Sequence, residues 1–424
     1  MKLINDDCVK AMKAMPDNSV DSIVTDPPYE LGFMGKSWDS SGIAFNVDVW
    51  QEALRVLKPG GHLIAFSGSR TYHRMAVAIE DAGFEIRDQI MWVYGSGFPK
   101  SHNVSKGIDK AADFEGEVIA TEKVDIGMQG GSMHAGRGTN VVERDVRELS
   151  DAAKQWDGWG TALKPAHEPI VLARKPLIGT VANNVLTFGT GGLNIDGSRV
   201  ASPDNDGKVW TRGGNGVNAR SGSKNAQDNP QLNGESELVQ PNELGRWPAN
   251  FIHDGSDEVV ALFPDTKSGD WKGQKKGVAF DGNENGQPYF WQGDSGSAAR
   301  FFYCAKASKR DRNEGLDGFA PIRKVFMATK NGTGEPSKGL ERFTTEPSAN
   351  HHPTVKPTAL MQYLVRLVTP PNGIVLDPFM GSGSTGKACA YEGFDFIGID
   401  QSAEYVEIAR ARIEYVNTAI ITLA

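Results

Sequence analysis

The order of apolar runs and helical repeats at the two ends of the chain constrains the fold more than any other feature. In the first hundred residues, apolar runs at 20–25 and 62–66 flank a segment, 47–57, that carries apolar residues at helical spacing. We expect Lys58-Pro59-Gly60-Gly61 to break the chain between this helical segment and the second apolar run. The last eighty residues repeat this order, with a helical segment at 358–368 and apolar runs at 374–376 and 396–399. Such alternation is typical of a mostly parallel sheet covered by helices. We therefore predict an α/β, doubly wound fold whose two halves are separated in sequence and meet in space.

The middle of the chain has a different composition. Gly, Asn, Ser and Asp crowd residues 197–245 and 269–296, and glycine totals 49 of 424 residues, above the usual ~7%. A linker seldom carries as many aromatic side chains as this stretch does, so we predict an ordered, loop-rich module. We expect residues 1–200, with a surface insertion at about 111–151, and residues 346–424 to form one domain, and residues 201–345 to form a separate region.

Composition argues against several classes of protein. No apolar run approaches the roughly 18 residues that a membrane span needs, and the N-terminus lacks the basic and apolar regions of a secretory signal. We therefore expect a cytoplasmic protein without membrane association. The three cysteines and eight histidines show none of the spacings of a metal site, so we predict no metal.

A tetrapeptide, Asp26-Pro27-Pro28-Tyr29, directly follows the first apolar run. Taken alone, it could be a rigid turn that closes a strand. Its chemistry suits an exocyclic aromatic amine, which is a weak nucleophile because its lone pair is delocalised into the ring. Asp26 can accept one N–H, a carbonyl of the Pro-Pro region can accept the other, and Tyr29 offers a face on which an extruded base stacks. We interpret these four residues as a catalytic loop.

A second loop, Asp377 to Gly383, follows the apolar run 374–376 and opens a helix. Its glycines let the backbone approach a ligand, and the helix N-terminus supplies free N–H groups. Asp400 ends the next apolar run, where α/β nucleotide sites place the acid that holds ribose hydroxyls. Ligands of doubly wound sheets bind outside the carboxyl ends of the strands. We therefore expect the two loops to face one another.

With DPPY placed before FxGxG, the chain resembles the amino-methyltransferases of bacterial and phage DNA in their permuted order. The resemblance covers about residues 1–110, 155–200 and 345–424. It implies a methyltransferase sheet, S-adenosylmethionine as cofactor, double-stranded DNA as partner, and residues 201–345 as the target-recognition region. Permuted members often dimerise, which leaves a homodimer open.

The resemblance also implies a set of cofactor contacts. Residues 352–357 look like the family's HPTxKP segment, which lies against the methionine end of the cofactor. Asp6 stands where Gly is usual, so the choice between Asp6 and Asp7 for the acidic residue near adenine is open. The implied cofactor-binding residues are Asp7, Thr354, Lys356, Asp377, Phe379, Gly381, Gly383 and Asp400.

One basic segment stands out in a chain whose net charge is -8. Residues 300–342 hold ten Lys and Arg against five acidic residues. We expect Lys306, Lys309, Arg310 and Arg312 to contact DNA phosphates, and a solvated helix face is the alternative.

The predicted activity is direct methyl transfer to the exocyclic amine of a flipped base. We favour N6 of adenine as the acceptor, because the aspartate form of the loop is more typical of adenine methylases. Cytosine N4 is the nearest alternative. A protein-glutamine or RNA methylase, or a non-catalytic DNA-binding protein with this fold, is more remote. A ring-carbon methylase needs a cysteine nucleophile, usually after proline, and no cysteine here follows one. A partner endonuclease, as in restriction-modification, is left open.

Overall fold

The structure, a computed structural model, forms two compact units. The first comprises Met1–Asn194, Asn250–Val259 and Cys304–Ala424, and the second comprises Ile195–Ala249 and Val260–Tyr303. The structure describes residues 1–31, 37–97, 101–125, 141–201, 210–212, 237–239, 245–267, 271–272, 290–291, 295–306, 308–322, 325–326, 343–344 and 348–423.

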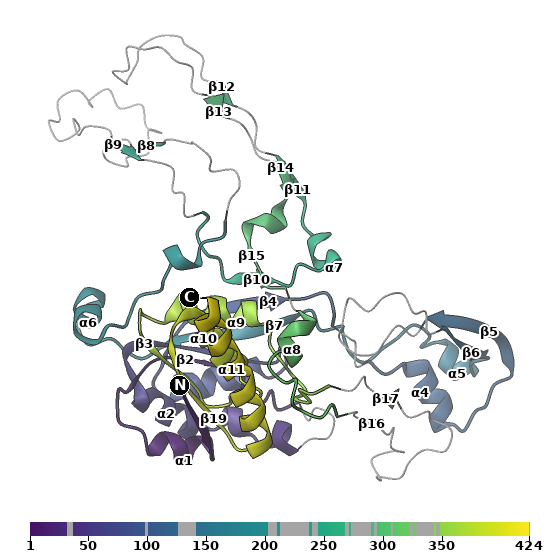
Figure 1. Ribbon diagram of the computed structural model, residues 1–424. Coiled ribbons are helices and arrows are strands. Elements are labelled where there is room, and N and C mark those ends of the chain that lie inside the picture. The colour runs from purple at the N-terminus through teal and green to yellow at the C-terminus, as the bar shows by residue number, and fades with distance from the viewer. Residues whose placement is uncertain are drawn as a thin grey trace. The chain divides into compact units, whose positions relative to one another are not determined.

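A nine-stranded sheet organises the described part of the chain (Figure 1). The five strands from β1 to β3 in the spatial order are parallel, β7 runs antiparallel to both its neighbours, and β10 is parallel to β4. This confirms the predicted mostly parallel α/β sheet. The spatial order is β1 (Lys2–Asn5), β19 (Asp395–Asp400), β18 (Ile374–Asp377), β2 (Val20–Thr25), β3 (Leu57–Phe66), β7 (His167–Arg174), β4 (Glu85–Val93), β10 (Phe251–His253) and β15 (Tyr303–Cys304).

Two groups of helices cover the sheet. The first group is α1 (Cys8–Lys13), α2 (Val47–Val56) and α3 (Tyr72–Asp81), and the second is α9 (Thr358–Val368), α10 (Ser384–Glu392) and α11 (Ala403–Leu423). Leu63 and Ala65 of β3 belong to the core that the first group covers, while the alternating Ile64 and Phe66 are also fully buried. Since side chains alternate across a strand, the sheet is buried on both faces.

Local sequence explains these helices. In α2, the buried Val49, Trp50, Ala53 and Val56 recur at helical spacing, and the Asn46 side chain caps the helix by accepting from Asp48 N. The bounds predicted from periodicity, 47–57 for α2 and 358–368 for α9, agree with the structure within a residue. In contrast, β3 extends back through Pro59 and Gly60, where we expected a break, because the segment continues to pair beside β2 across a bulge.

The remaining elements are short or lie in the insertions. The surface insertion folds as an antiparallel pair, β5 (Val118–Asp125) and β6 (Val141–Arg147), next to α4 (Val104–Ala111) and α5 (Asp151–Lys154). None of the helices in the described ranges has the length and apolar character of a membrane span. The others are α6 (Val181–Phe188), α7 (Asp257–Val260), α8 (Lys309–Asn313), β8 (Trp210–Arg212), β9 (Glu237–Val239), β11 (Asp265–Lys267), β12 (Trp271–Lys272), β13 (Phe290–Trp291), β14 (Ser295–Ser297), β16 (Val325–Phe326) and β17 (Phe343–Thr344).

Candidate active site

The two predicted loops begin side by side. β2 and β18 are parallel neighbours at the centre of the sheet, with Ser22 opposite Val375 and Ile23 opposite Leu376. Their carboxyl ends therefore meet at one edge, where the sheet order changes from the C-terminal half of the chain to the N-terminal half. The Thr25 hydroxyl donates to Asp377 Oδ1 at 2.7 Å and ties the two ends together.

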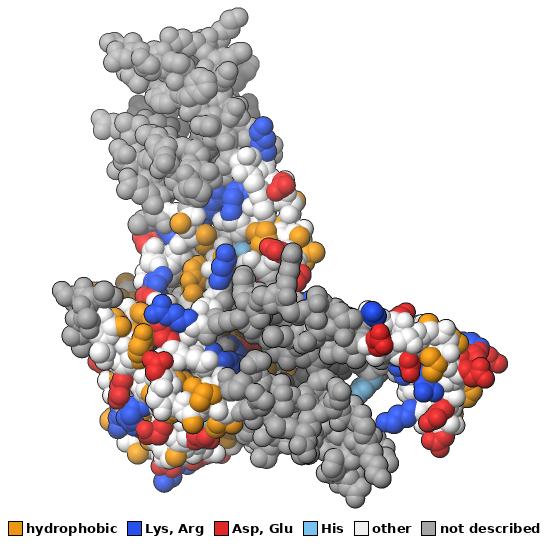
Figure 2. All heavy atoms as spheres, turned by 45° about the vertical axis from the view of Figure 1, so that its right-hand side comes forward, with side chains coloured by type: hydrophobic (Ala, Val, Ile, Leu, Met, Phe, Trp, Pro, Cys, Tyr) orange, Lys and Arg blue, Asp and Glu red, His pale blue; other side chains and the backbone are white. Residues whose placement is uncertain are grey.

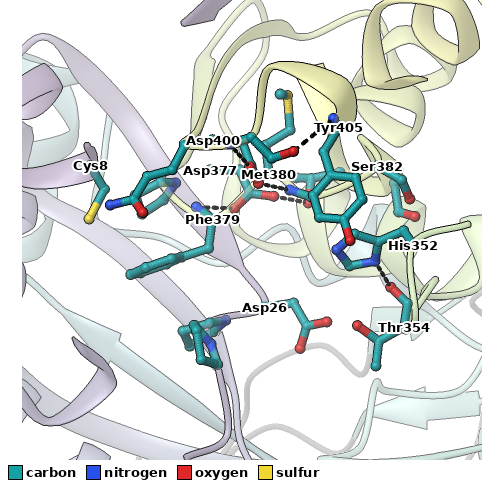
Figure 3. A pocket seen from close by; sticks show the side chains of 18 of the residues that line it. Cys8, Asp26, His352, Thr354, Asp377, Phe379, Met380, Ser382, Asp400 and Tyr405 are labelled. Atoms are coloured by element: carbon teal, nitrogen blue, oxygen red, sulfur yellow. Dashed lines mark hydrogen bonds between the residues drawn. The ribbon is translucent and has the colours of Figure 1, made fainter. Parts of the chain in front are cut away.

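A cavity of about 660 Å³ lies outside this edge, within the size range of small-molecule sites. Both loops and the segment around Thr354 contribute to its wall, and Figure 3 shows Asp26 and Phe379 on opposite sides of one space that Thr354 also borders. The predicted site residues that line it are Asp26, Pro27, Pro28, Tyr29, Thr354, Lys356, Asp377, Phe379, Gly381 and Asp400.

The two oxygens of the Asp26 carboxylate have different surroundings. Lys356 Nζ donates to Oδ2 at 2.8 Å. Oδ1 is buried, and among the residues that the structure describes it has no hydrogen-bond partner. A buried oxygen without a donor is costly, so such groups are uncommon unless they serve a ligand. Asp26 therefore presents a free acceptor at the cavity.

Tyr29 is held at both ends. Its hydroxyl donates to Glu168 Oε2 at 2.7 Å and accepts from Lys356 Nζ at 3.1 Å, while its backbone carbonyl accepts from the Thr71 hydroxyl at 2.7 Å. Burial, followed by the negative charges of Asp26 and Glu168, raises the pKa of Tyr29 well above its ordinary value. The hydroxyl therefore stays protonated, and the ring is fixed beside Asp26.

Lys356 is the cation that joins these groups. Its side chain is only 7% exposed, and its ammonium also lies 3.2 Å from Glu168 Oε2. Burial alone would favour the neutral amine, but the carboxylates of Asp26 and Glu168 outweigh burial and raise the pKa of Lys356 above its ordinary value. Lys356 therefore keeps its charge, and its hydrogen bonds go to the Asp26 loop and to β7.

The carboxylates of Asp377 and Asp400 each accept at least two hydrogen bonds beside the glycine loop. Asp377 accepts from Thr25, from the Thr385 hydroxyl at 2.6 Å and from Phe379 N at 3.1 Å. Burial raises its pKa to about 7 despite these donors. Asp400 accepts from Gly381 N at 2.9 Å and from Ser402 N, and burial raises its pKa as well. Both carboxylates thus shape the loop.

The two glycines of this loop are required by close contacts. Gly381 has φ +53°, and a Cβ there would lie 2.9 Å from His352 Nε2. Gly383 has φ +79°, and a Cβ there would lie 2.8 Å from the Cβ of Ala409 on α11. Gly383 caps α10 and is not among the residues that line the cavity, so its contact is with α11. Only Gly381 lies at the cavity wall.

His352 packs against the loop as a neutral ring. Burial lowers its pKa to about 3, although its Nδ1 lies 2.7 Å from the Thr354 carbonyl oxygen. Its ring also meets the Tyr405 ring edge-on, with centroids 4.6 Å apart. The segment 352–356 is therefore fixed against Gly381 at one end and, through Lys356, against Asp26 at the other.

Asp6 and Asp7, the acidic pair near the N-terminus, have different surroundings. Asp7 caps α1 by accepting from Lys10 N at 2.9 Å, and its other oxygen accepts from Gln401 Nε2 at 3.0 Å. Asp6, not Asp7, is among the residues that line the cavity. Of the two acidic residues between which the sequence left the choice open, Asp6 thus lines the cavity and Asp7 caps α1.

The four residues expected at phosphates have different environments. Lys306 and Arg310 are exposed, and Arg310 Nε pairs with Glu314 at 2.6 Å. Arg312 NH1 donates instead to the carbonyls of Asn350 and His352, at 3.2 and 2.9 Å, and the side chain of Lys309 lies outside the described residues. On the face drawn in Figure 2, basic and acidic side chains are interspersed over the described part of the molecule.

Sequence reasoning missed two residues that support the site. Glu168, at the start of β7, holds Tyr29 and Lys356. Arg412 of α11 is fully buried and donates to the carbonyl and hydroxyl of Ser382 in the glycine loop, and to the Asp311 carbonyl at 2.6 Å. Burial lowers the pKa of Arg412 to about 10, so it remains cationic at neutral pH. The only signal in the sequence for Glu168 was a carboxylate beside an apolar run, and nothing in the sequence singled out Arg412.

Comparison with known proteins adds a family match. The family described as DNA methylase, N6_N4_Mtase, matches residues 20–411. Type II methyltransferase M2.DpnII of Streptococcus pneumoniae is 41% identical over 85 residues, which are 20% of this chain and 30% of that protein. Type II methyltransferase M.Cfr9I of Citrobacter freundii is 39% identical over 125 residues, which are 30% of this chain and 36% of that protein. The matched segments thus span about a third of the length of these relatives.

Solved structures give weaker likenesses. The crystal structure of the M1.HpyAVI–SAM complex is 16% identical with a TM-score of 0.38, covering 97% of this chain and 98% of that one. The structure titled PvuII DNA methyltransferase (cytosine-N4-specific) is 12% identical with a TM-score of 0.42, covering 99% and 92%.

Proposed function

The chain belongs to the N6_N4_Mtase family of DNA methylases, and from this premise we propose that it transfers a methyl group from S-adenosylmethionine to the exocyclic amine of a flipped base in double-stranded DNA. The observation that carries the proposal is that Asp26 lines the cavity beside the glycine loop, while its buried Oδ1 has no hydrogen-bond partner among the described residues. A hydrogen-bond acceptor at that place suits an amine that must be held for attack.

The hydrogen-bonding groups and the charges of the cavity wall suit S-adenosylmethionine. Carboxylates of Asp6 and Asp400 line it together with the ring of Phe379, and they can accept hydroxyl and amine groups of a nucleoside and pack on its base. Among the described residues that line the cavity, Lys356 is the one Lys or Arg. An acidic wall suits the positive charge of a sulfonium. When bound, the cofactor supplies an electrophilic methyl group.

The residues of the Asp26 loop would hold the base. Asp26 Oδ1 accepts one N–H of the target amine, and a carbonyl of Pro27 or Pro28 accepts the other. Tyr29, fixed through its hydroxyl, presents a ring on which the flipped base stacks. The amine lone pair forms the N–C bond as the C–S bond breaks, and the amine then releases one proton, for which Asp26 Oδ1 is an acceptor within the cavity. Alignment of this kind contributes a large share of enzymatic rate.

We favour N6 of adenine as the acceptor because the loop carries aspartate, and N4 of cytosine is the alternative. The test is transfer of a tritiated methyl group from S-adenosylmethionine to unmethylated DNA, compared with RNA and with protein. Digestion of the product to nucleosides should yield N6-methyladenine. N4-methylcytosine would overturn the choice of base, and label in RNA or protein alone would overturn the proposal. Sequencing of modified bases in the same DNA gives the recognition site.

DNA contacts are proposed for the basic segment and for residues 201–345. Lys306 and Arg310 are the exposed members of the described basic set, whereas Arg312 bonds to two backbone carbonyls. Each phosphate contact releases counterions, so the logarithm of the DNA affinity falls with the logarithm of the salt concentration. Replacing Lys306 and Arg310 with Ala should flatten that slope, and an unchanged slope would place the phosphate contacts elsewhere.

A further inference from the structure

We propose that Glu168 is a positioning residue: it shares the Lys356 ammonium with Asp26, leaves Asp26 Oδ1 free for the target amine, and gives the site a net negative charge that favours a sulfonium over a thioether. The inference deepens the proposed function and rests on it. Its consequence is that the chain should distinguish S-adenosylmethionine from its neutral product, S-adenosylhomocysteine, through a residue that does not belong to either motif.

The geometry places Glu168 at the junction of the two motifs. β7 runs antiparallel between β3 and β4, so its first residues lie at the edge where β2 and β18 end. Glu168 Oε2 accepts from the Tyr29 hydroxyl at 2.7 Å and lies 3.2 Å from Lys356 Nζ. Its side chain is 18% exposed and lines the cavity. A partly buried carboxylate with two such partners is set in place by the fold.

The sharing of Lys356 explains why Asp26 has a free oxygen. The ammonium has three N–H groups, and three oxygens surround it: Asp26 Oδ2, Glu168 Oε2 and the Tyr29 hydroxyl. Each of the three donors therefore has one acceptor, and no N–H remains for Asp26 Oδ1. Without the charge of Glu168, the ammonium would be drawn toward Asp26, and it would compete with the target amine for the two carboxylate oxygens.

The group formed by Asp26, Glu168 and Lys356 has a net negative charge. Asp26 and Glu168 carry two negative charges, and Lys356 carries one positive charge. Among the other described residues that line the cavity, Asp6, Asp39 and Asp400 are acidic, burial raises the pKa of Asp377 to about 7, and His352 is neutral. The excess is therefore negative. A ligand with a positive sulfonium gains attraction from it that a neutral thioether does not, because partly buried charges are poorly screened.

This imbalance has a consequence for turnover. Methyl transfer converts the cationic cofactor into an uncharged thioether, and the proton released from the amine is free to reach Asp26. Both changes reduce the electrostatic attraction between the site and the spent cofactor. Glu168 thus favours binding of the reactant and release of the product by one and the same charge.

The test is Glu168→Gln, measured by titration calorimetry with each ligand in turn. Glutamine keeps the size of the side chain, and its carbonyl can still accept from Tyr29, so the change isolates the charge. We expect the affinity for S-adenosylmethionine to fall on the order of ten-fold, with that for S-adenosylhomocysteine changed less than about two-fold. Glu168→Asp keeps the charge and should keep the affinity ratio of the wild type, while its shorter reach to Tyr29 lowers the methylation rate.

Glu407→Gln provides the matched control, because Glu407 on α11 is 63% exposed and its removal should leave both affinities unchanged. Unchanged binding of the neutral ligand by Glu168→Gln also reports that the variant is folded. An unchanged ratio, or an equal loss of both ligands, would overturn the inference. A wild-type protein that binds neither ligand would instead refute the proposed function, and this inference with it.

Discussion

The loops after β2 and β18 open with the same residue type at neighbouring strand ends, yet their carboxylates have opposite surroundings. Asp377 receives three hydrogen bonds, from two hydroxyls and a backbone N–H, and is buried. Asp26 receives one ammonium on Oδ2 and nothing from the described residues on Oδ1. The comparison teaches that position at the sheet edge makes a carboxylate available, and that its neighbours decide whether it supports the loop or remains free for a ligand.

The largest expected effect is the loss of methyl transfer when Asp26 is replaced. Asp26→Ala removes the side-chain acceptor that we assign to the target amine, so methyl transfer should fall by a factor on the order of 10² to 10⁴. Lys356 retains Glu168 as its counter-ion, so the fold and the binding of S-adenosylhomocysteine should persist. Methylation rates and calorimetry on one preparation measure both.

Asp377→Ala is the matched change on the other loop. It leaves the Thr25 and Thr385 hydroxyls and Phe379 N without their acceptor, so it should lower the thermal midpoint and weaken cofactor binding. If Asp26→Ala lost cofactor binding and Asp377→Ala kept it, our assignment of the two loops would be wrong.

The next largest effect is a weaker binding of the cofactor when Asp400 is replaced. Asp400→Ala should weaken S-adenosylmethionine binding by roughly 1.5 to 3 kcal/mol, because the ribose hydroxyls would lose a charged acceptor. The same change frees Gly381 N, which Asp400 now orients. Turnover at saturating cofactor should fall much less than in Asp26→Ala. A fall in turnover as large as that of Asp26→Ala, with binding intact, would contradict the separation of roles.

The smallest effect concerns pH. Burial raises the pKa of Asp377 to about 7 from an ordinary 3.8. Between these values the folded protein holds a proton that the unfolded chain has released, so this group's contribution to stability is full below about pH 4 and is lost as the pH rises through about 7. The free energy of unfolding in urea should therefore fall more between pH 5 and pH 8 for the wild type than for Asp377→Asn. Parallel curves for the two proteins would show that Asp377 does not titrate in this range.

Much of the fold was predictable because it rests on local periodicity. Apolar residues at helical spacing predicted α2 and α9, and apolar runs predicted β2, β18 and β19. The two loops were predictable for the same reason: each is a short stretch whose glycines or prolines, acid and preceding strand are contiguous in sequence. Their meeting at one edge followed from a general rule of parallel sheets.

The partners of the site residues were not predictable, because they come from distant parts of the chain. Lys356 and Asp26 are 330 positions apart, and Tyr29 and Glu168 are 139 positions apart. No local pattern distinguishes a carboxylate that faces the cavity, such as Asp6, from one that caps a helix, such as Asp7. The same holds for Arg312, which we expected to contact a phosphate and which donates to two backbone carbonyls in the fold.

The sequence by itself thus determined the kind of sheet, the two loops and the chemistry that their residue types allow. Only the tertiary structure decided which oxygen of Asp26 is free, which cation neutralises it and which carboxylate shares that cation. The physical reason is that backbone preferences and apolar periodicity act over a few residues. Hydrogen bonds and charge interactions depend on distances of a few ångströms in space, which exist only after the separated halves of the sheet have paired.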